Sequence, residues 1–263
     1  MTFAVSKGGV GKSLLAANVG AALASRGNKV VLVEGDPNRP LQLILNSNID
    51  SEAVRLEDVV KKDIAISKAV STTRIANLFL VPSGVSLESY FEINPVRFAK
   101  KLMDLNCDYM IIDTPFPLGE AAFLSLGVCQ YFLLILTEDE FTLCVEAAID
   151  TIRLGKYYLK CIPLGFVLNR IKTPKKFNEE FVRDLEHLLD VPCLAKIDED
   201  SNVSKSYGGA KEAEAFLAYT QLPNSSFHKS IDQIASCLER ELPKPEKRDA
   251  VSFLKSVTKP VKT

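Results

Sequence analysis

Short apolar runs alternate along the chain with longer stretches of helical periodicity. The apolar runs fall at residues 3–5, 29–33, 78–81, 109–112, 131–136, 164–168 and 193–195. They are continuous and do not alternate with polar residues, so we expect strands that are buried on both faces. Strands of this kind are typical of a parallel sheet that helices cover on each side.

Helical stretches separate these runs. The segment 12–25 is rich in alanine and leucine, and Gly27 and Asn28 predict its end. Further helices are predicted at 95–105, 140–159, 177–189 and 227–241. The repeated order of strand and helix predicts an α/β fold with a single doubly wound, mostly parallel sheet and helices on both faces. Because Pro243 and Pro245 end the last helix, we predict one domain at 1–242 and a basic tail at 243–263.

Composition narrows the class of protein. The chain has 263 residues, of which 47% are hydrophobic and 25% are charged, so general disorder is not expected. The net charge of -1 does not favour a nucleic-acid-binding protein, which usually has a basic domain. Six cysteines lack the close pairing of a zinc site, which favours buried, reduced thiols. With no leader and no spanning segment expected, we predict a soluble, cytoplasmic protein.

A glycine-rich loop joins the first predicted strand to the first predicted helix. Residues 6–13 read SKGGVGKS. Glycines allow backbone N–H groups to converge on phosphate oxygens, and the following helix adds the partial positive charge of its N-terminus. Lys12 supplies a full charge for the β- and γ-phosphates, and the Ser13 hydroxyl is a ligand for Mg²⁺. The segment therefore predicts a nucleoside triphosphate site.

Carboxylates follow two of the other predicted strands. Glu34 and Asp36 come after the run at 29–33, and Asp113 comes directly after the run at 109–112. An aspartate at the carboxyl end of a buried strand is the usual second element of a phosphate-loop site, where it holds Mg²⁺.

The loop departs from the standard G-x-x-x-x-G-K-[ST] motif because Ser6 replaces the first glycine. It matches the deviant form K-G-G-x-G-K-[ST], and on this motif the chain resembles the MinD/ParA family of ATPases, archaeal MinD-like members most of all. Further stretches carry the resemblance across residues 3–240, namely VEGDP at 33–37, VPSGVSLE at 81–88, IIDTP at 111–115, NR at 169–170 and LPNSS at 222–226.

The resemblance implies a P-loop fold and specific roles for residues. Lys7, Lys12 and Asp36 are the implied catalytic residues: Lys7 reaches the phosphates bound by a partner chain, and Asp36 orients the attacking water. The implied ligands of Mg²⁺ are Ser13, Asp36 and Asp113. The implied ATP/ADP-binding residues are Gly8, Gly9, Val10, Gly11, Lys12, Ser13, Leu14, Asn169, Arg170, Ile197, Glu199 and Asp200. ATP is favoured over GTP because residues 169–172 read NRIK and lack the aspartate of a guanine-binding element.

The chain departs from the family pattern at three places. Glu34 stands where the family usually has aspartate, which leaves its role open. Residues 116–119 read FPLG, so the second switch segment differs from the family's, and Asp198 replaces a proline beside the base.

The resemblance implies a slow, Mg²⁺-dependent ATP hydrolase that dimerises on binding ATP and separates after hydrolysis. Such a switch acts in cell division or positioning, together with a regulatory protein that the sequence does not identify. The alternatives are a ParA-like ATPase that positions DNA or cargo, with DNA the less favoured partner, and a nucleotide-binding scaffold with little turnover. Assembly of a metal cofactor is disfavoured because no C-x-C or C-x-x-C pair occurs.

The tail at 243–263 has two interpretations. It carries six basic and two acidic residues, and Val251, Leu254 and Val257 have helical spacing. A short amphipathic helix of this kind binds anionic lipid weakly, which predicts peripheral association with the inner face of the cell membrane. A disordered, solvated tail is the alternative.

Overall fold

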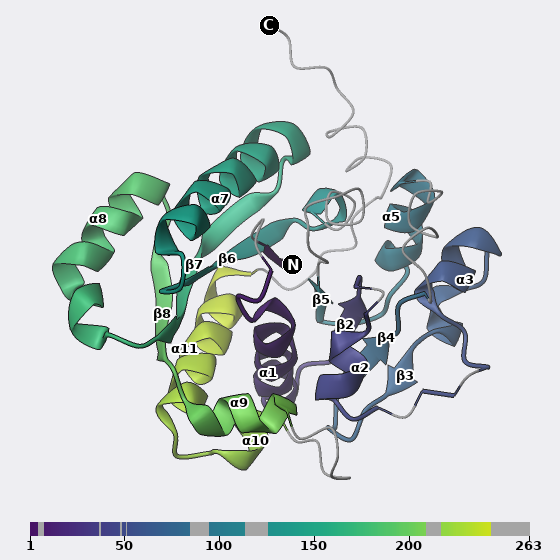
Figure 1. Cartoon of the computed structure of the whole chain (residues 1–263). Coiled ribbons are helices and arrows are strands. Elements are labelled where there is room, and N and C mark those ends of the chain that lie inside the picture. Colours follow the sequence, from purple (N-terminus) through teal and green to yellow (C-terminus); the bar gives the residue numbers. More distant parts are fainter. Residues whose placement is uncertain are drawn as a thin grey trace, which may run out of the picture.

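The computed structural model describes residues 1–4, 8–36, 38–47, 49–50, 52–84, 95–113, 126–208 and 217–242 (Figure 1). Its strands are β1 (Thr2–Ala4), β2 (Val30–Glu34), β3 (Ser71–Thr72), β4 (Leu78–Val81), β5 (Tyr109–Asp113), β6 (Tyr131–Thr137), β7 (Ile162–Ile171) and β8 (Cys193–Asp198). Its α-helices are α1 (Lys12–Ser25), α2 (Pro40–Ile44), α3 (Leu56–Lys61), α5 (Pro95–Met103), α7 (Phe141–Arg153), α8 (Glu179–Leu189), α9 (Ser201–Gly208), α10 (Ala218–Gln221) and α11 (Ser226–Glu241). Shorter turns are the 3₁₀ helices η1 (Ile66–Lys68) and η3 (Pro174–Phe177) and the π-helix η2 (Leu154–Leu159).

In the described part of the chain, eight strands form one sheet in the order β3-β4-β2-β5-β1-β6-β7-β8. Every pair is parallel except β3 with β4. The chain leaves β1 in one direction to form β2, and leaves β6 in the opposite direction to form β7. Because such crossovers are right-handed, α1 must lie on one face of the sheet and α7 and α8 on the other.

Figure 1 shows this arrangement, with α1 and α11 on one side of the sheet and α7 and α8 on the other. The sheet is apolar on both faces, and Phe3, Phe132 and Phe166 are fully buried. Helix α1 is buried around almost its whole circumference because it packs against the sheet and is flanked by α11, α2 and α10. The predicted doubly wound fold with covered faces is therefore confirmed.

The strand order changes direction at β1, which lies between β5 and β6. In open parallel sheets, ligands bind beyond the carboxyl ends of the strands at such a switch point. The loop after β1 is the glycine-rich segment, and the register places Glu34 beside Asp113 at the ends of β2 and β5. The topology thus gathers the predicted site residues at one edge of the sheet.

Four of the five predicted helices have different bounds in the structure. The helix predicted at 95–105 ends at Met103, and the helix predicted at 227–241 begins at Ser226. The helix predicted at 140–159 is α-helical only to Arg153 and continues as the π-helix η2. Gly155 lies in η2, and a Cβ atom there would fall 2.6 Å from Cε1 of Phe132, so the helix approaches the sheet more closely than any other residue would allow. The helix predicted at 177–189 begins at Glu179, because the Asn178 side chain accepts a hydrogen bond from the N–H of Phe181 at 2.9 Å.

The outer edge of β8 is covered by side chains. Glu186 accepts the hydrogen bond of the Cys193 N–H at 2.7 Å. Gln233 donates to the carbonyl of Leu194 at 2.8 Å, and Ser230 donates to the carbonyl of Lys196 at 3.0 Å. Helices α8 and α11 thereby satisfy backbone groups on and beside the last strand.

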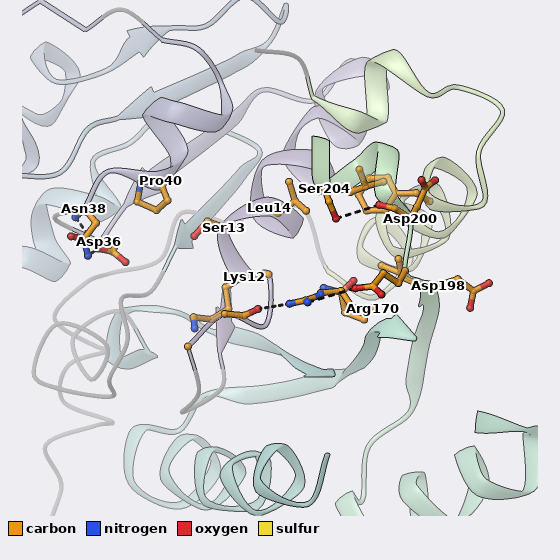
Figure 2. Close-up of a pocket in the computed structure, with 18 residues that line it drawn as sticks. Lys12, Ser13, Leu14, Asp36, Asn38, Pro40, Arg170, Asp198, Asp200 and Ser204 are labelled. Carbon is orange, nitrogen blue, oxygen red and sulfur yellow. Dashed lines mark hydrogen bonds and ion pairs between the residues drawn. The ribbon is translucent and has the colours of Figure 1, made fainter. Parts of the chain in front are cut away.

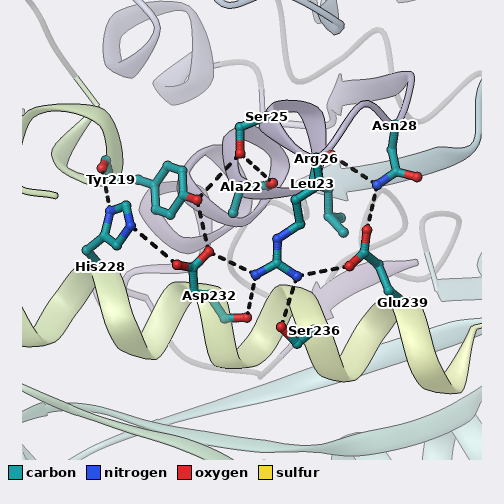
Figure 3. Close-up of polar contacts among 10 residues, drawn as sticks. All are labelled: Ala22, Leu23, Ser25, Arg26, Asn28, Tyr219, His228, Asp232, Ser236 and Glu239. Atoms are coloured by element: carbon teal, nitrogen blue, oxygen red, sulfur yellow. Dashed lines mark hydrogen bonds and ion pairs between the residues drawn. The ribbon is translucent and has the colours of Figure 1, made fainter.

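A polar cluster joins the C-terminal end of α1 to α11 (Figure 3). The Arg26 guanidinium donates to Asp232, Ser236 and Glu239, each at 2.9 Å. Tyr219 donates to the same Asp232 carboxylate at 2.9 Å. Although partial burial acts to raise it, the pKa of Asp232 is lowered by the hydrogen bonds from Arg26 and Tyr219. The ionised carboxylate therefore stabilises the fold above about pH 4, and this contribution is lost as the pH falls through the lowered pKa.

We expect Arg26→Ala to lower the free energy of unfolding by about 1–2 kcal/mol, because one side chain serves three partners and is only 25% exposed. The melting temperature, measured by circular dichroism, should fall by about 2–6 °C. Arg153→Ala is the control, since Arg153 is 69% exposed and pairs with Asp150 at 3.8 Å. Equal melting temperatures for the two variants would contradict this role of the cluster.

Several predicted features lie outside the described residues: Lys7, the stretches 85–88 and 114–119, and the tail 243–263. The division into a domain at 1–242 and a tail stays a prediction. Among the described helices, none combines the length and hydropathy that are needed to span a bilayer.

Candidate nucleotide-binding site

A cavity of about 440 Å³ lies beyond the carboxyl ends of the central strands. Figure 2 shows Asp36 and Asn38 at one end, Asp200 and Ser204 at the other, and the helix-initiating residues Lys12 and Ser13 between them. The volume lies within the range of small-molecule sites. Its lining residues are Gly8, Gly9, Gly11, Lys12, Ser13, Leu14, Asp36, Asn38, Pro40, Asn169, Arg170, Ile197, Asp198, Glu199, Asp200, Val203, Ser204 and Phe227.

Gly11 sets the geometry of the phosphate loop where it enters α1. Its φ of 95° is in the left-handed region, and the N–H of Leu15 donates to its carbonyl at 2.9 Å as the first bond of the helix. A Cβ atom on Gly11 would fall 2.7 Å from Nδ2 of Asn169. The backbone conformation and the close approach both require glycine here, and they leave the N-terminus of α1 open to an anion.

Opposite charges are buried together beneath the loop. Lys12 is 7% exposed, and burial lowers the pKa of its ammonium group while Asp113 and Asp36 act to raise it. Asp113 is fully buried, and burial raises the pKa of its carboxyl to about 7, although Ser13 and Lys12 oppose the rise. Because charges interact strongly in such a desolvated site, Lys12 is well placed to hold a phosphate.

The residues present fit a bound Mg²⁺ ion. Both carboxylate oxygens of Asp113 are buried, and among the described residues neither forms a hydrogen bond of good geometry, although the Ser13 hydroxyl is close enough to lower the pKa of the carboxyl. A buried carboxylate with incomplete hydrogen bonding is costly, and a divalent cation or its coordinated water would satisfy it. The Ser13 hydroxyl lies near Asp113 and lines the cavity. Oxygen ligands of this kind suit Mg²⁺.

Asp36 begins a tight turn at the end of the cavity. Its Oδ1 accepts hydrogen bonds from the backbone N–H and the side-chain amide of Asn38, each at 2.9 Å. The carbonyl of Asp36 accepts from the N–H of Arg39 at 3.0 Å. The carboxylate is therefore held on the loop between β2 and α2, close enough to Lys12 to affect the pKa of its ammonium group.

The other end of the cavity is less polar and has a second set of contacts. Ile197, Val203 and Phe227 form apolar walls, as a nucleotide base requires. The Asn169 side chain is almost fully buried, and its Nδ2 donates to the carbonyl of Val10 at 2.8 Å. Strand β7 thus contacts the phosphate loop directly.

Arg170 connects the phosphate loop with acidic side chains at the protein surface. Its guanidinium donates to the carbonyl of Gly9 at 3.1 Å and forms ion pairs with Asp139 and Glu199, both at 3.6 Å. Asp139 also pairs with Lys172 at 2.8 Å. These charges join three loops at the mouth of the cavity: the phosphate loop, the turn before α7 and the segment after β8.

The structure brings most of the predicted nucleotide-binding residues to one cavity. Val10 is buried and is not among the described residues that line the cavity, but its carbonyl accepts a hydrogen bond from Asn169, which does line it. Asp200 lines the cavity and also caps α9, because its Oδ1 accepts from the N–H of Asn202 at 2.8 Å. Sequence reasoning missed the cavity-lining residues Asn38, Pro40, Val203, Ser204 and Phe227.

A glycine-rich loop at the switch point of a parallel sheet, followed by a helix and flanked by a buried lysine and aspartate, defines a P-loop nucleotide-binding protein. The chain belongs to the CobQ/CobB/MinD/ParA nucleotide binding domain family, which matches residues 1–212. The resemblance that the sequence motifs indicated is thereby confirmed.

Individual relatives agree with this assignment. An uncharacterized ATP-binding protein of Methanocaldococcus jannaschii is 32% identical over 261 residues, which cover 98% of this chain and 94% of the relative. The crystal structure of the Pyrococcus furiosus cell division ATPase MinD matches with a TM-score of 0.75 and 26% identity, covering 91% of this chain and 97% of that one. MinD of Pyrococcus horikoshii, complexed with Mg-ADP, matches with a TM-score of 0.74 and 25% identity over 92% and 95% of the two chains.

Proposed function

We propose that the protein binds ATP with Mg²⁺, dimerises around two nucleotides and hydrolyses ATP, so that the nucleotide state controls the oligomer. The observation that carries this proposal is the convergence of three charged residues beside the N-terminus of α1: Lys12 and Asp36 line the cavity, and the buried Asp113 lies close enough to affect the pKa of Lys12. A relative whose solved structure holds Mg-ADP supports the choice of nucleotide and metal.

Each residue has a distinct task in this proposal. Backbone N–H groups of the phosphate loop and the Lys12 ammonium group bind the phosphates. Ser13 and Asp113 hold Mg²⁺, with Asp36 close by, and the ion neutralises phosphate charge when it is bound. Asp36 orients the attacking water, which is mainly a matter of position and charge.

Asn169 supports recognition of adenine. One N–H of its Nδ2 donates to the Val10 carbonyl, which fixes the orientation of the amide and leaves its oxygen as an acceptor for a base. An acceptor suits the exocyclic amino group of adenine and opposes the carbonyl oxygen of guanine. Arg170, Ile197 and Glu199 complete the base end of the site.

The switch requires a second copy of the chain. In the proposed dimer Lys7 reaches the phosphates bound by the partner, so that loss of the γ-phosphate weakens the contact between the two chains. The cellular role that fits is a MinD-like switch in division or positioning that acts with a regulatory protein. We also propose that residues 243–263 bind weakly to a membrane.

The dimer is tested by measuring the mass in solution by light scattering. With Mg²⁺ and ADP we expect the monomer mass of 29.0 kDa, and with a slowly hydrolysed ATP analogue about twice that mass. Lys7→Ala should keep the monomer mass with both nucleotides. A wild-type mass that is the same with the two nucleotides would reject the switch and favour a constitutive nucleotide-binding scaffold.

A further inference from the structure

Glu34 is the last residue of β2 and is fully buried. The lining of the cavity, as far as the described residues define it, includes Asp36 and Asn38 but not Glu34. Its side chain is therefore buried behind the wall of the nucleotide site. The sequence left the role of this residue open, and its contacts supply one.

The Glu34 carboxylate binds the first turn of α2. One oxygen accepts from the backbone N–H of Gln42 at 3.1 Å, and the other accepts from the Gln42 side-chain amide at 2.6 Å. The second oxygen also accepts from the N–H of Ser83 at 3.4 Å. The N-cap residue of α2, Arg39, makes no side-chain capping bond. Glu34 from β2 caps the helix instead, because it accepts the hydrogen bond of the Gln42 N–H.

These bonds close the loop that carries Asp36. Glu34 precedes the loop and Gln42 follows it, and the two are joined directly. Between them, Asp36 is tied to Asn38 by two hydrogen bonds of its own. A loop held at both ends and braced in the middle has few alternative conformations, so its carboxylate is kept in one place.

We propose that Glu34 is a positioning residue for hydrolysis: its carboxylate clamps Gln42 and thereby fixes the loop that presents Asp36 to the nucleotide. This inference rests on the proposed function, because it takes Asp36 as the residue that orients water. The clamp acts on turnover and leaves nucleotide binding to the phosphate loop.

The clamp depends on the length of the glutamate side chain. Aspartate, the usual residue of the family at this position, is shorter by one carbon, or about 1.5 Å. The contact of 2.6 Å with the Gln42 amide would then exceed the limit of a hydrogen bond. Glu34→Asp therefore keeps the charge beside Asp113 but releases α2.

The test uses the full-length protein in four variants: Glu34→Asp, Gln42→Leu, the double substitution and Gln130→Leu. Gln42→Leu removes one donor from the clamp, and Gln130→Leu makes the same change at the opposite edge of the sheet, next to the start of β6. For each, kcat is measured by phosphate release, and the Kd is measured for a slowly hydrolysed ATP analogue.

We expect Glu34→Asp and Gln42→Leu each to lower kcat by about 10- to 100-fold, with the Kd changed by less than about threefold. The double variant should be no slower than the slower single variant, because the two substitutions break the same contact, that between the Glu34 carboxylate and the Gln42 amide. Gln130→Leu should retain the wild-type kcat. An unchanged kcat in Gln42→Leu, or multiplied effects in the double variant, would overturn the clamp.

A second measurement is independent of hydrolysis. Hydrogen exchange of the backbone amides at residues 35–43 should accelerate by at least about tenfold in Glu34→Asp and Gln42→Leu, and should not change in Gln130→Leu. If the wild-type protein does not hydrolyse ATP, the proposed function fails, and the exchange rates still decide the clamp. Unchanged exchange in both clamp variants would reject it.

Discussion

Replacing Lys12 with alanine is expected to raise the Kd for ATP with Mg²⁺ by at least about 100-fold, because a desolvated charge is lost from the phosphate site. The ammonium group is almost fully buried, so little solvent screens its interaction with a phosphate. Isothermal titration calorimetry measures the effect directly.

The matched control is Lys29→Ala. Lys29 directly precedes β2, at the edge of the sheet opposite the cavity, and its N–H donates to Asp108. This variant should bind ATP with the wild-type Kd, and both variants should keep the circular dichroism spectrum of the wild type. A Kd for Lys12→Ala within about threefold of the wild type would show that Lys12 does not contribute to ATP binding.

Asp36→Asn should lower kcat by about 100-fold or more while the Kd for ATP stays within about threefold of the wild type. The two side chains have the same shape, and the asparagine oxygen can still accept the hydrogen bonds from Asn38. The substitution therefore removes only the negative charge, which in the proposed function orients the attacking water. Phosphate release under saturating ATP measures the change.

Asp198→Asn controls for the removal of a charge from the cavity. Asp198 lines the same cavity but lies at its base end, near Asp200 (Figure 2). We expect its kcat to stay within about twofold of the wild type. Similar losses in the two variants would show that net charge, and not the place of Asp36, controls turnover.

The strands could be predicted because their continuous apolar sequences indicate that both faces are buried. Seven apolar runs correspond to β1, β2 and β4–β8, and the helix at 12–25 has the predicted bounds of α1. The remaining elements have little local signal. Strand β3 has two residues, and α2, α3, α9 and α10 are short, so their stability comes from tertiary contacts. Helix α2 illustrates this, since its capping group lies on β2.

The residues of the candidate site could likewise be predicted where they form one segment, and not where only the fold brings them together. The phosphate loop is one continuous segment whose glycines have a defined conformational purpose, so its residues could be named in advance. Val203, Ser204 and Phe227 reach the cavity only because α9 and the start of α11 fold against it. The Glu34 contacts with Gln42 and Ser83 likewise depend on the fold, because β2 meets α2 and β4 there.

The covered edge of β8 has a consequence for how copies of this chain associate. An open strand edge can recruit a further strand from any neighbouring molecule, and such additions are slow to reverse and tend to continue. With Glu186, Gln233 and Ser230 already bonded to backbone groups of β8, these groups cannot pair with an added strand at this edge. A protected edge of this kind is compatible with the reversible, nucleotide-controlled dimer that we propose, because strand addition at this edge would not compete with it.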